Sequence, residues 1–318
     1  MTNKEKYILL EKQNKDLPVF MQSWWLDMVC KNSWDVFLVE EDNNILAAFP
    51  YYIHKNKFFT SIIPPKLTPV CGCYVDYSYC NRISERYSLE NRITEEFALF
   101  IDSLKPSFFS YALRPEDFFC MGFYWNNFSN TVRYTYRVDV SDIDKCFDSF
   151  VPVMRKNIRR AERLLHTESD KFNLTQIYDL LQQTYTKQKT IIPYSFATFE
   201  NIVSQSIQHN QGKLLIAKDE KENINGVLFI VWDNNICYNL ISGIDYKFEK
   251  NKVMAYLTWK AMQHAHSLNL RTFDMEGSMI KNIEHYFRFF SGTRTPYLCI
   301  TKEYSLFYSL LRRIKRSF

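Results

Sequence analysis

Polar and apolar residues alternate over residues 272–276, which read Thr-Phe-Asp-Met-Glu. In a β-strand, successive side chains point to opposite faces, so Asp274 and Glu276 would share one face. Gly277 follows where the backbone must turn, and Ser278 is suited to cap a helix. We therefore predict a strand that presents two neighbouring carboxylates at its C-terminal end, where α/β proteins commonly bind ligands.

A helix and a second strand are predicted after this turn. Apolar residues recur at helical spacing from Ile283 to Phe290, which leaves Arg288 on the polar side. Gly292 stands where a helix commonly ends, because glycine adopts positive φ at little cost. The strand is expected over residues 297–301.

The composition is typical of a packed two-domain protein. A chain of 318 residues is long enough for two cores, and 17% aromatic residues with only 7 glycines argue against disorder. No apolar run reaches the roughly 18 residues of a membrane-spanning helix. The first residues, Met-Thr-Asn-Lys-Glu-Lys, lack the apolar segment of a signal peptide. We therefore expect a cytoplasmic protein with no transmembrane segment.

Charge and cysteine content indicate neither general nucleic-acid binding nor a metal site. The net charge of +5 depends on four basic residues within 312–316; without them the 40 basic side chains nearly balance the 35 acidic ones. The 8 cysteines are scattered, and Cys71, Cys73 and Cys80 lack the spacing of a zinc site. No metal and no tightly bound cofactor are expected.

The predicted elements follow a similar order in the two halves of the chain. The first half has helices over 21–31 and 84–104 and strands over 35–40, 45–54, 58–63 and 108–114. The second half has helices over 143–166, 173–190, 195–210 and 253–268 and strands over 213–218, 226–232 and 236–242, before the strand, helix and strand described above.

Two short sequence segments near the C-terminus resemble a known family. Residues 273–279, Phe-Asp-Met-Glu-Gly-Ser-Met, and residues 284–292, Glu-His-Tyr-Phe-Arg-Phe-Phe-Ser-Gly, resemble the C-terminal signature of Fem-like acyltransferases of the GNAT superfamily. The family usually ends this signature in Phe-Gly-Gly, whereas this chain reads Phe-Ser-Gly. Residues 20–26, 64–72 and 155–161 resemble three further family segments, so the likeness covers nearly the whole chain.

This resemblance implies an α/β (α+β) fold of two tandem GNAT-like domains, each a mixed, largely antiparallel sheet flanked by helices. It assigns residues 1–137 plus 303–318 to the first domain and residues 138–302 to the second. Fem-like proteins include the aminoacyl transferases that build peptidoglycan cross-bridges. The resemblance therefore implies an N-acyltransferase that acts on an amine of a cell-envelope precursor such as peptidoglycan or surface polysaccharide.

Asp274 and Glu276 are the candidate catalytic residues. Acyl transfer to an amine needs a base for the ammonium proton and an acceptor that orients the nucleophile. Two adjacent carboxylates can divide these roles, because their mutual repulsion raises one pKa. The alternative is structural: one carboxylate caps the next helix and the other pairs with Arg288 or Lys281.

A basic helix is the candidate anion-binding surface. Arg155, Arg159 and Arg163 are spaced i, i+4, i+8, and Lys156 and Arg160 lie on the adjoining row. A diphosphate, a tRNA backbone or anionic lipid headgroups would each match this charge. The alternative is a solvated surface with no ligand.

The expected acyl donor is a co-substrate, and acetyl-CoA held in the usual GNAT manner is disfavoured. GNAT acetyltransferases hold the pyrophosphate in a glycine-rich loop before a helix. The equivalent residues 242–255 contain no glycine after Gly243. Known Fem members use aminoacyl-tRNA, so that donor is implied by resemblance. Acyl-CoA with a sugar amine as acceptor, and a non-catalytic binder of tRNA or lipid-linked precursor, remain the alternatives.

The remaining expectations concern the cleft and the tail. The residues expected to line the cleft, by their position relative to the strands, are Tyr194, Tyr238, Ser242, Asp245, Ser278 and Arg288. Residues 304–318 combine an apolar stripe with flanking basic residues. Such a helix would either pack on the first domain or lie on an anionic membrane surface, which would make the protein peripheral at the inner face of the membrane.

Overall fold

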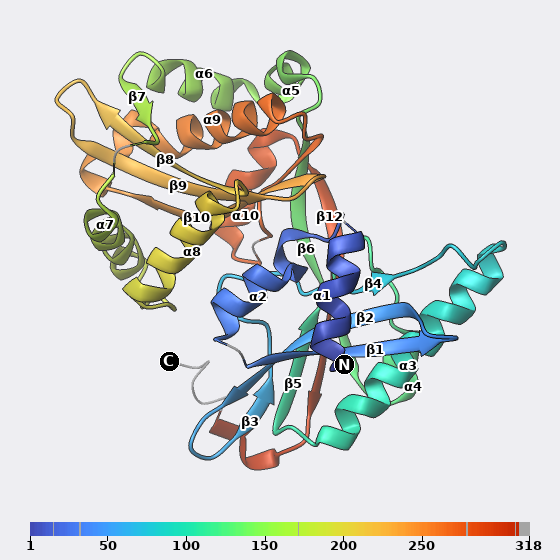
Figure 1. The fold of residues 1–318 in the computed structure, drawn as a ribbon. Coiled ribbons are helices and arrows are strands. Elements are labelled where there is room, and N and C mark those ends of the chain that lie inside the picture. Colours follow the sequence, from blue (N-terminus) through green and yellow to red (C-terminus); the bar gives the residue numbers. More distant parts are fainter. Residues whose placement is uncertain (15, 32, 171, 278, 309, 312–318) are drawn as a thin grey trace. The chain divides into compact units, whose positions relative to one another are not determined.

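The structure, a computed structural model, describes residues 1–14, 16–31, 33–170, 172–277, 279–308 and 310–311 (Figure 1). The chain divides into two compact units. The first unit comprises Met1–Arg133 and Pro296–Phe318, and the second comprises Tyr134–Thr295. Two long strands, β6 (Ser129–Asp139) and β12 (Thr293–Glu303), carry the chain from one unit to the other.

The first unit contains the remaining elements up to residue 125. These are α1 (Asn3–Gln13), η1 (Val19–Met21), α2 (Ser23–Cys30), β1 (Trp34–Glu41), β2 (Asn44–Lys55), β3 (Thr60–Ile62), β4 (Tyr74–Val75), α3 (Ile83–Leu104), β5 (Phe108–Ala112) and α4 (Met121–Trp125).

The second unit contains the elements between the two long strands. These are α5 (Ile143–Ser149), α6 (Pro152–Ala161), β7 (Leu165–Glu168), α7 (Leu174–Lys187), α8 (Phe196–Gln208), β8 (Gly212–Asp219), β9 (Ile224–Trp232), β10 (Ile236–Ile244), η2 (Tyr246–Asn251), α9 (Val253–Ser267), β11 (Thr272–Asp274), α10 (Lys281–Phe287) and η3 (Arg288–Phe290).

Both units pair their strands in the same order. In the first, β1–β2 and β2–β3 are antiparallel, β3–β5 is parallel, and β5–β12 is antiparallel. In the second, β8–β9 and β9–β10 are antiparallel, β10–β11 is parallel, and β11–β6 is antiparallel. A helix, α3 or α9, lies between the parallel strands in sequence, as a parallel crossover requires. This repeat matches the similar order of elements predicted for the two halves.

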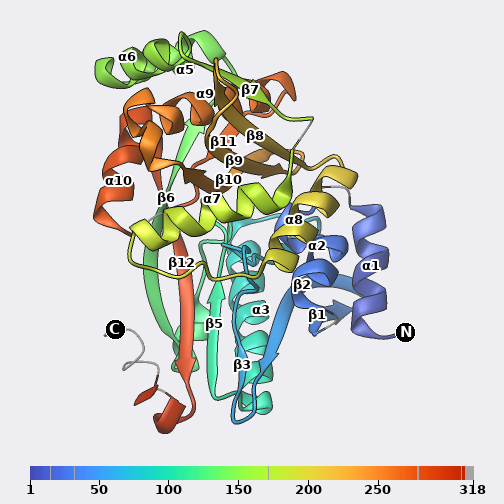
Figure 2. The ribbon, with the colours of Figure 1, turned by 90° about the vertical axis from the view of Figure 1, so that its left-hand side faces the viewer.

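The sheet of the second unit is covered on both faces (Figures 1 and 2). A Cβ on Gly226 in β9 would meet Val253 of α9, whereas one on Gly243 in β10 would meet Leu181 of α7. The two helices therefore lie on opposite faces. Because α9 is covered in turn by α6, it is buried on nearly every side, from Val253 to Ala265.

The first unit also has a core on each face of its sheet. Phe49 of β2 stacks on Phe97 of α3 at 4.5 Å between ring centroids, in a cluster that includes Tyr111 of β5. The next residue along β2, Ala48, belongs to a separate cluster under α1 and α2. This alternation is the period of two that a strand imposes on its side chains.

The largest error in the predicted elements is the single helix over 143–166. Pro152 divides it, because proline has no amide donor and is tolerated only in the first turn of a helix. The structure has α5 before this proline, α6 with Pro152 at its start, and the short strand β7 from Leu165. Strand β6 was not predicted at all.

The tail is described only in part. Residues 306–308 are helical, and the ring of Tyr308 lies 5.0 Å from Phe59 and 6.0 Å from Phe108, within the first unit. Leu306 is 91% exposed. The residues from 312 on lie outside the described part, so packing and membrane binding both remain predictions. No helix among the described residues is long and apolar enough to cross a membrane.

Candidate active site

The candidate site begins where β11 ends. Asp274 is the last residue of the strand and lies opposite Arg137 of β6 and beside Tyr238 of β10. The predicted strand continued to Glu276, but Glu276 has φ of +56°, a left-handed conformation that ends the alternation. The two carboxylates therefore do not share one face of a strand, and their surroundings differ.

Asp274 is a fully engaged carboxylate. Its Oδ2 accepts a hydrogen bond from Arg137 Nε at 2.9 Å, and its Oδ1 accepts from Thr135 Oγ1 at 2.5 Å. The same Oδ1 accepts from the backbone amide of Glu276 at 2.9 Å. Asp274 is 4% exposed. These contacts orient the Asp274 side chain and tie it to the residue that follows the strand.

The second carboxylate, Glu276, has one side-chain oxygen, Oε1, in an unusual environment. The residue is partly exposed, but its Oε1 is buried and has no hydrogen-bond partner among the described residues. Burial, and then the charge of Asp274, raises the pKa of Glu276 well above its usual value. A buried carboxyl oxygen without a partner costs free energy unless a ligand or water satisfies it. Glu276 is therefore the side chain here best suited to exchange a proton with a bound group.

Gly277 holds this turn against β6. A Cβ at position 277 would lie 2.0 Å from the carbonyl oxygen of Tyr134, closer than any side chain tolerates. The backbone after Glu276 therefore passes directly beside residues 134 and 135. The glycine predicted as a turn residue is required by this close approach.

The two parallel strands separate next to the carboxylates. β10 and β11 pair only from Ile236–Thr272 to Tyr238–Asp274, after which β11 ends and β10 continues to Ile244. The register between β10 and β9 also shifts between Asn239 and Ile241. The side-chain oxygen of Asn239 is buried and has no hydrogen-bond partner among the described residues. Two such oxygens, of Asn239 and Glu276, thus lie within two residues of the last strand pair.

Arg288 belongs to a network on the other face of the sheet. Tyr136 donates its hydroxyl hydrogen to Glu284 Oε1 at 2.5 Å, and Arg288 Nε lies 3.5 Å from Glu284 Oε2. Arg288 also contacts His285 Nδ1 at 2.6 Å. The predicted alternative, in which Arg288 or Lys281 pairs with Asp274 or Glu276, is wrong for Asp274, whose cation is Arg137.

The other residues expected in the cleft are spread along the unit. Tyr194 is buried beside Tyr178 and Tyr185, and Ser242 is exposed on β10. Asp245 caps η2 by accepting from the amide of Lys247 at 2.9 Å. Position 245 is seven residues beyond Tyr238, roughly 20 Å along a strand. Only Tyr238 adjoins Asp274, and Ser278 lies outside the described residues.

The predicted basic helix is present as α6, but it is shorter. Because α6 ends at Ala161, Arg163 lies in the turn before β7 rather than on the same helical row. Arg155 donates to the carbonyl oxygen of Asp148, and the guanidinium of Arg159 lies 5.3 Å from the Phe147 ring. Glu162, the acidic residue that follows α6, pairs with Lys260 at 3.3 Å.

The surface around α6 keeps its positive charge. None of its five basic side chains forms an ion pair with a residue that the structure describes; they are Arg155, Lys156, Arg159, Arg160 and Arg163. Such a surface favours an anionic ligand.

The segment between β10 and α9 has no phosphate-binding loop of the acetyltransferase kind. The 3₁₀ helix η2 occupies it, and α9 begins after Lys252, which has φ of +59°. In the described part of the chain, no three His, Cys, Asp or Glu side chains are placed to hold a metal ion.

Sequence reasoning missed Thr135 and Arg137, the partners of Asp274. The signal was available: residues 132–139 alternate, with Val132, Tyr134, Tyr136 and Val138 separated by Arg133, Thr135, Arg137 and Asp139. A period of two over this length predicts a strand. Placing that strand beside β11 would still have required the tertiary structure.

A family model matches part of the second unit. Residues 152–288 match the family model described as acetyltransferase (GNAT) domain. This range runs from α6 through β11 to α10 and contains both carboxylates. The second unit is therefore similar to a GNAT domain over most of its length. The pairing order repeated in the first unit gives the tandem, mixed α/β architecture expected from the sequence.

Solved structures place the whole chain in the same fold. FemX matches with a TM-score of 0.68 and 12% identity, over 99% of this chain and 98% of that chain. L-PGS from Bacillus licheniformis matches with a TM-score of 0.58 and 13% identity, over 96% and 94%. A tandem GNAT protein from the clavulanic acid biosynthesis pathway matches with a TM-score of 0.52 and 8% identity, over 91% and 98%.

These likenesses confirm the resemblance to Fem-like GNAT proteins at the level of the fold. A search of curated protein sequences gave no match.

Proposed function

We propose that the protein is an N-acyltransferase that transfers an acyl or aminoacyl group to an amine of a cell-envelope precursor. The observation that carries the proposal is the buried Oε1 of Glu276, which has no hydrogen-bond partner in the described part of the chain and lies where the pairing of β10 with β11 ends. It lies in the segment that matches the GNAT family model, and the fold is shared by FemX and L-PGS.

In the proposed reaction, Glu276, the acceptor amine and the leaving group each have a defined role. The acceptor arrives as an ammonium ion, and the ionised carboxylate of Glu276 takes one of its protons. The nitrogen then attacks the carbonyl carbon of the donor, forming a C–N bond. The tetrahedral intermediate then breaks the bond to the leaving oxygen or sulfur, which takes the second proton of the nitrogen, and Glu276 releases the first proton to solvent. A raised pKa suits Glu276 to this role, because it makes the ionised carboxylate a stronger base.

Asp274 acts through Glu276 in this scheme. Because Asp274 Oδ1 accepts from the amide of Glu276, it holds the left-handed turn that positions the Glu276 side chain. Its negative charge also disfavours ionisation of Glu276. The edge of β10 beyond Tyr238, which β11 leaves uncovered, offers backbone amides for the developing oxyanion.

The proposed donor is an aminoacyl-tRNA. The unpaired basic surface of α6 supports a polyanionic donor, and η2 stands where a glycine-rich loop would bind the pyrophosphate of CoA. The family description, acetyltransferase, favours acyl-CoA as the second candidate donor. A cell-envelope acceptor is proposed because FemX and L-PGS share the fold.

A transfer assay on the full chain tests the proposal. Labelled aminoacyl-tRNA and acetyl-CoA are offered separately with nucleotide-linked and lipid-linked envelope precursors that carry a primary amine. Label transferred from the tRNA, and lost in Glu276→Gln, supports the proposal. Transfer from acetyl-CoA alone, with a higher melting temperature in CoA, establishes the second candidate. Precursor binding without transfer from either donor overturns the enzyme assignment.

The basic surface has its own test. Lys156→Gln/Arg160→Gln/Arg163→Gln removes exposed charges without touching the core. If tRNA lies on this surface, the slope of log affinity against log salt should fall by about 2 to 3. The matched control, Lys12→Gln/Lys55→Gln/Lys57→Gln, removes the same charge elsewhere and should leave the slope nearly unchanged. Equal slopes in both variants would place the tRNA elsewhere.

A further inference from the structure

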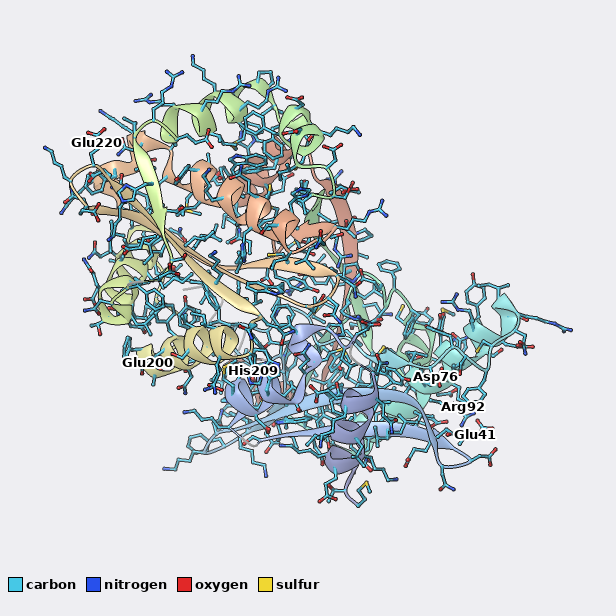
Figure 3. All side chains as sticks on the ribbon, turned by 45° about the horizontal axis from the view of Figure 1, so that its top comes forward. Glu41, Asp76, Arg92, Glu200, His209 and Glu220 are labelled. Atoms are coloured by element: carbon cyan, nitrogen blue, oxygen red, sulfur yellow. The ribbon has the colours of Figure 1, made fainter. Side chains whose placement is uncertain are left out.

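A cavity of about 450 Å³ lies in the first unit, and none of the residues assigned to transfer lines it. Its walls come from the turn between β1 and β2, the loop that carries Asp76, and the first turns of α3. Figure 3 shows Glu41, Asp76 and Arg92 together at one end of this unit. A volume of this size lies within the usual range of about 300–1,000 Å³ for small-ligand sites.

The cavity carries excess negative charge. Four carboxylates line it, from Glu41, Asp42, Asp76 and Glu85, against the single cation Arg92. Arg92 is already shared, because it contacts Glu41 at 2.8 Å and Glu96 at 2.9 Å.

The other carboxylates have only amide partners or none. Glu85 Oε2 accepts from the amides of Asn81 and Arg82 at the start of α3. Asp76 Oδ1 accepts from the amide of Ser78 at 2.8 Å. Asp42 and Asp76 form no ion pair with any residue in the described part of the chain. A ligand in this cavity would therefore meet uncompensated negative charge.

Part of the lining is apolar. Leu46 is buried, Leu89 is half-buried, and Tyr79 is 58% exposed. An apolar wall with acidic groups around it matches a ligand whose charged groups are separated by methylene segments. A metal ion does not match, since no metal-holding cluster of side chains occurs among the described residues.

We propose that this cavity binds a linear aliphatic polyamine. Its ammonium groups would meet Asp42 and Asp76 on either side, while its methylene chain would cover Leu46 and Leu89. The carboxylates exclude anionic ligands such as nucleotides, and they leave an uncharged ligand with no partner for their charge. This site is distinct from the proposed transfer function, and neither depends on the other.

Calorimetric titration of the full chain with spermidine tests the proposal. We expect one saturable site, and Asp42→Asn/Asp76→Asn should weaken it at least about tenfold. Both substitutions are compatible with the local structure. At position 76, asparagine keeps the Oδ1 acceptor for the amide of Ser78. At position 42, asparagine tolerates the φ of +49°. Asp35→Asn, which removes one exposed charge of β1 outside the cavity, is the control and should bind as the wild type does.

Two further measurements separate the cavity from general charge attraction. Ser88→Trp, on an exposed position of the cavity wall, should block binding while the melting temperature stays within a few degrees of the wild type. In the wild type, 1,8-octanediamine should bind and 1,8-octanediol should not.

Three results would overturn the proposal. One is no saturable binding. Another is equal weakening by Asp35→Asn. The third is displacement of spermidine by an equal concentration of Mg²⁺, which would show charge screening alone. Glu276→Gln should leave spermidine binding unchanged, so failure of one proposal does not imply failure of the other.

Discussion

Arg137 and Asp274 face each other across the β6–β11 ladder, with Nε and Oδ2 2.9 Å apart. Their side chains are only 16% and 6% exposed. The pair locks one of the two candidate carboxylates in place, while the other retains a buried oxygen with no partner among the described residues. In the proposed mechanism, Asp274 is therefore a positioning residue and Glu276 is the base.

Breaking this pair should destabilise the protein strongly. Asp274→Asn and Arg137→Gln should each lower the free energy of unfolding by about 3 kcal/mol, because each leaves its partner's charge poorly compensated in a buried site. The double variant should lose less than the sum, with a coupling of at least about 1 kcal/mol. Urea unfolding of the four proteins measures the cycle. Additive losses would mean that the contact contributes little.

Glu276→Gln should separate activity from stability. Transfer should fall at least about 100-fold, the usual range for loss of a general base. At high pH, Glu276→Gln should be more stable than the wild type. Because the folded-state pKa is raised, the wild type loses stability as the pH rises above about 4.5, and glutamine does not.

The measurement is the melting temperature of both proteins from pH 4.5 to 8. We expect similar values at the acidic end and a higher value for Glu276→Gln at pH 8. A wild type more stable than the variant at pH 8 would contradict the raised pKa. Full transfer activity in the variant would instead remove Glu276 from the mechanism.

Gly277→Ala should disturb the turn that carries Glu276. The new Cβ would lie 2.0 Å from the carbonyl oxygen of Tyr134, so the backbone must move, at an expected cost of about 1–3 kcal/mol and with loss of transfer. Gly292→Ala is the milder comparison, since its nearest neighbours, Val138 Cγ2 and the carbonyl oxygen of Arg137, would lie 3.0 and 3.1 Å away. Chemical denaturation and the transfer assay should show larger losses of stability and activity for Gly277→Ala than for Gly292→Ala. Equal losses would show that the close contact between position 277 and the carbonyl oxygen of Tyr134 does not require glycine.

His264 should make the protein sensitive to mild acid. Burial, and then Lys213, lowers the pKa of His264 to about 4, while the unfolded value is about 6.5. As the pH falls from 6.5 to 4, the unfolded chain binds a proton that the folded chain does not, so stability falls.

His264→Gln should therefore show a smaller drop in melting temperature across this range than the wild type. His54→Gln, at an exposed position, should behave as the wild type does. Parallel curves for the wild type and His264→Gln would contradict the lowered pKa.

Several local features were predictable because their cause is local. Helix α7 and the strands of the β8–β10 meander lie within a few residues of their predicted bounds, since each combines a regular apolar period with clear end signals. Helix α1 was missed because its apolar residues show no helical period. A capping box between Thr2 and Glu5 and the burial of Tyr7 hold it instead.

The sequence by itself determined the tandem order of elements, the Fem-like resemblance and the presence of two acids and a glycine at the end of β11. Only the tertiary structure decided how those acids differ. Position 137 precedes Asp274 by more than a hundred residues, and no local periodicity of apolar residues indicates which strand will pair with β11. The Arg137 pair depends on that pairing, and with the left-handed turn at Glu276 it leaves one carboxyl oxygen buried with no partner that the structure describes.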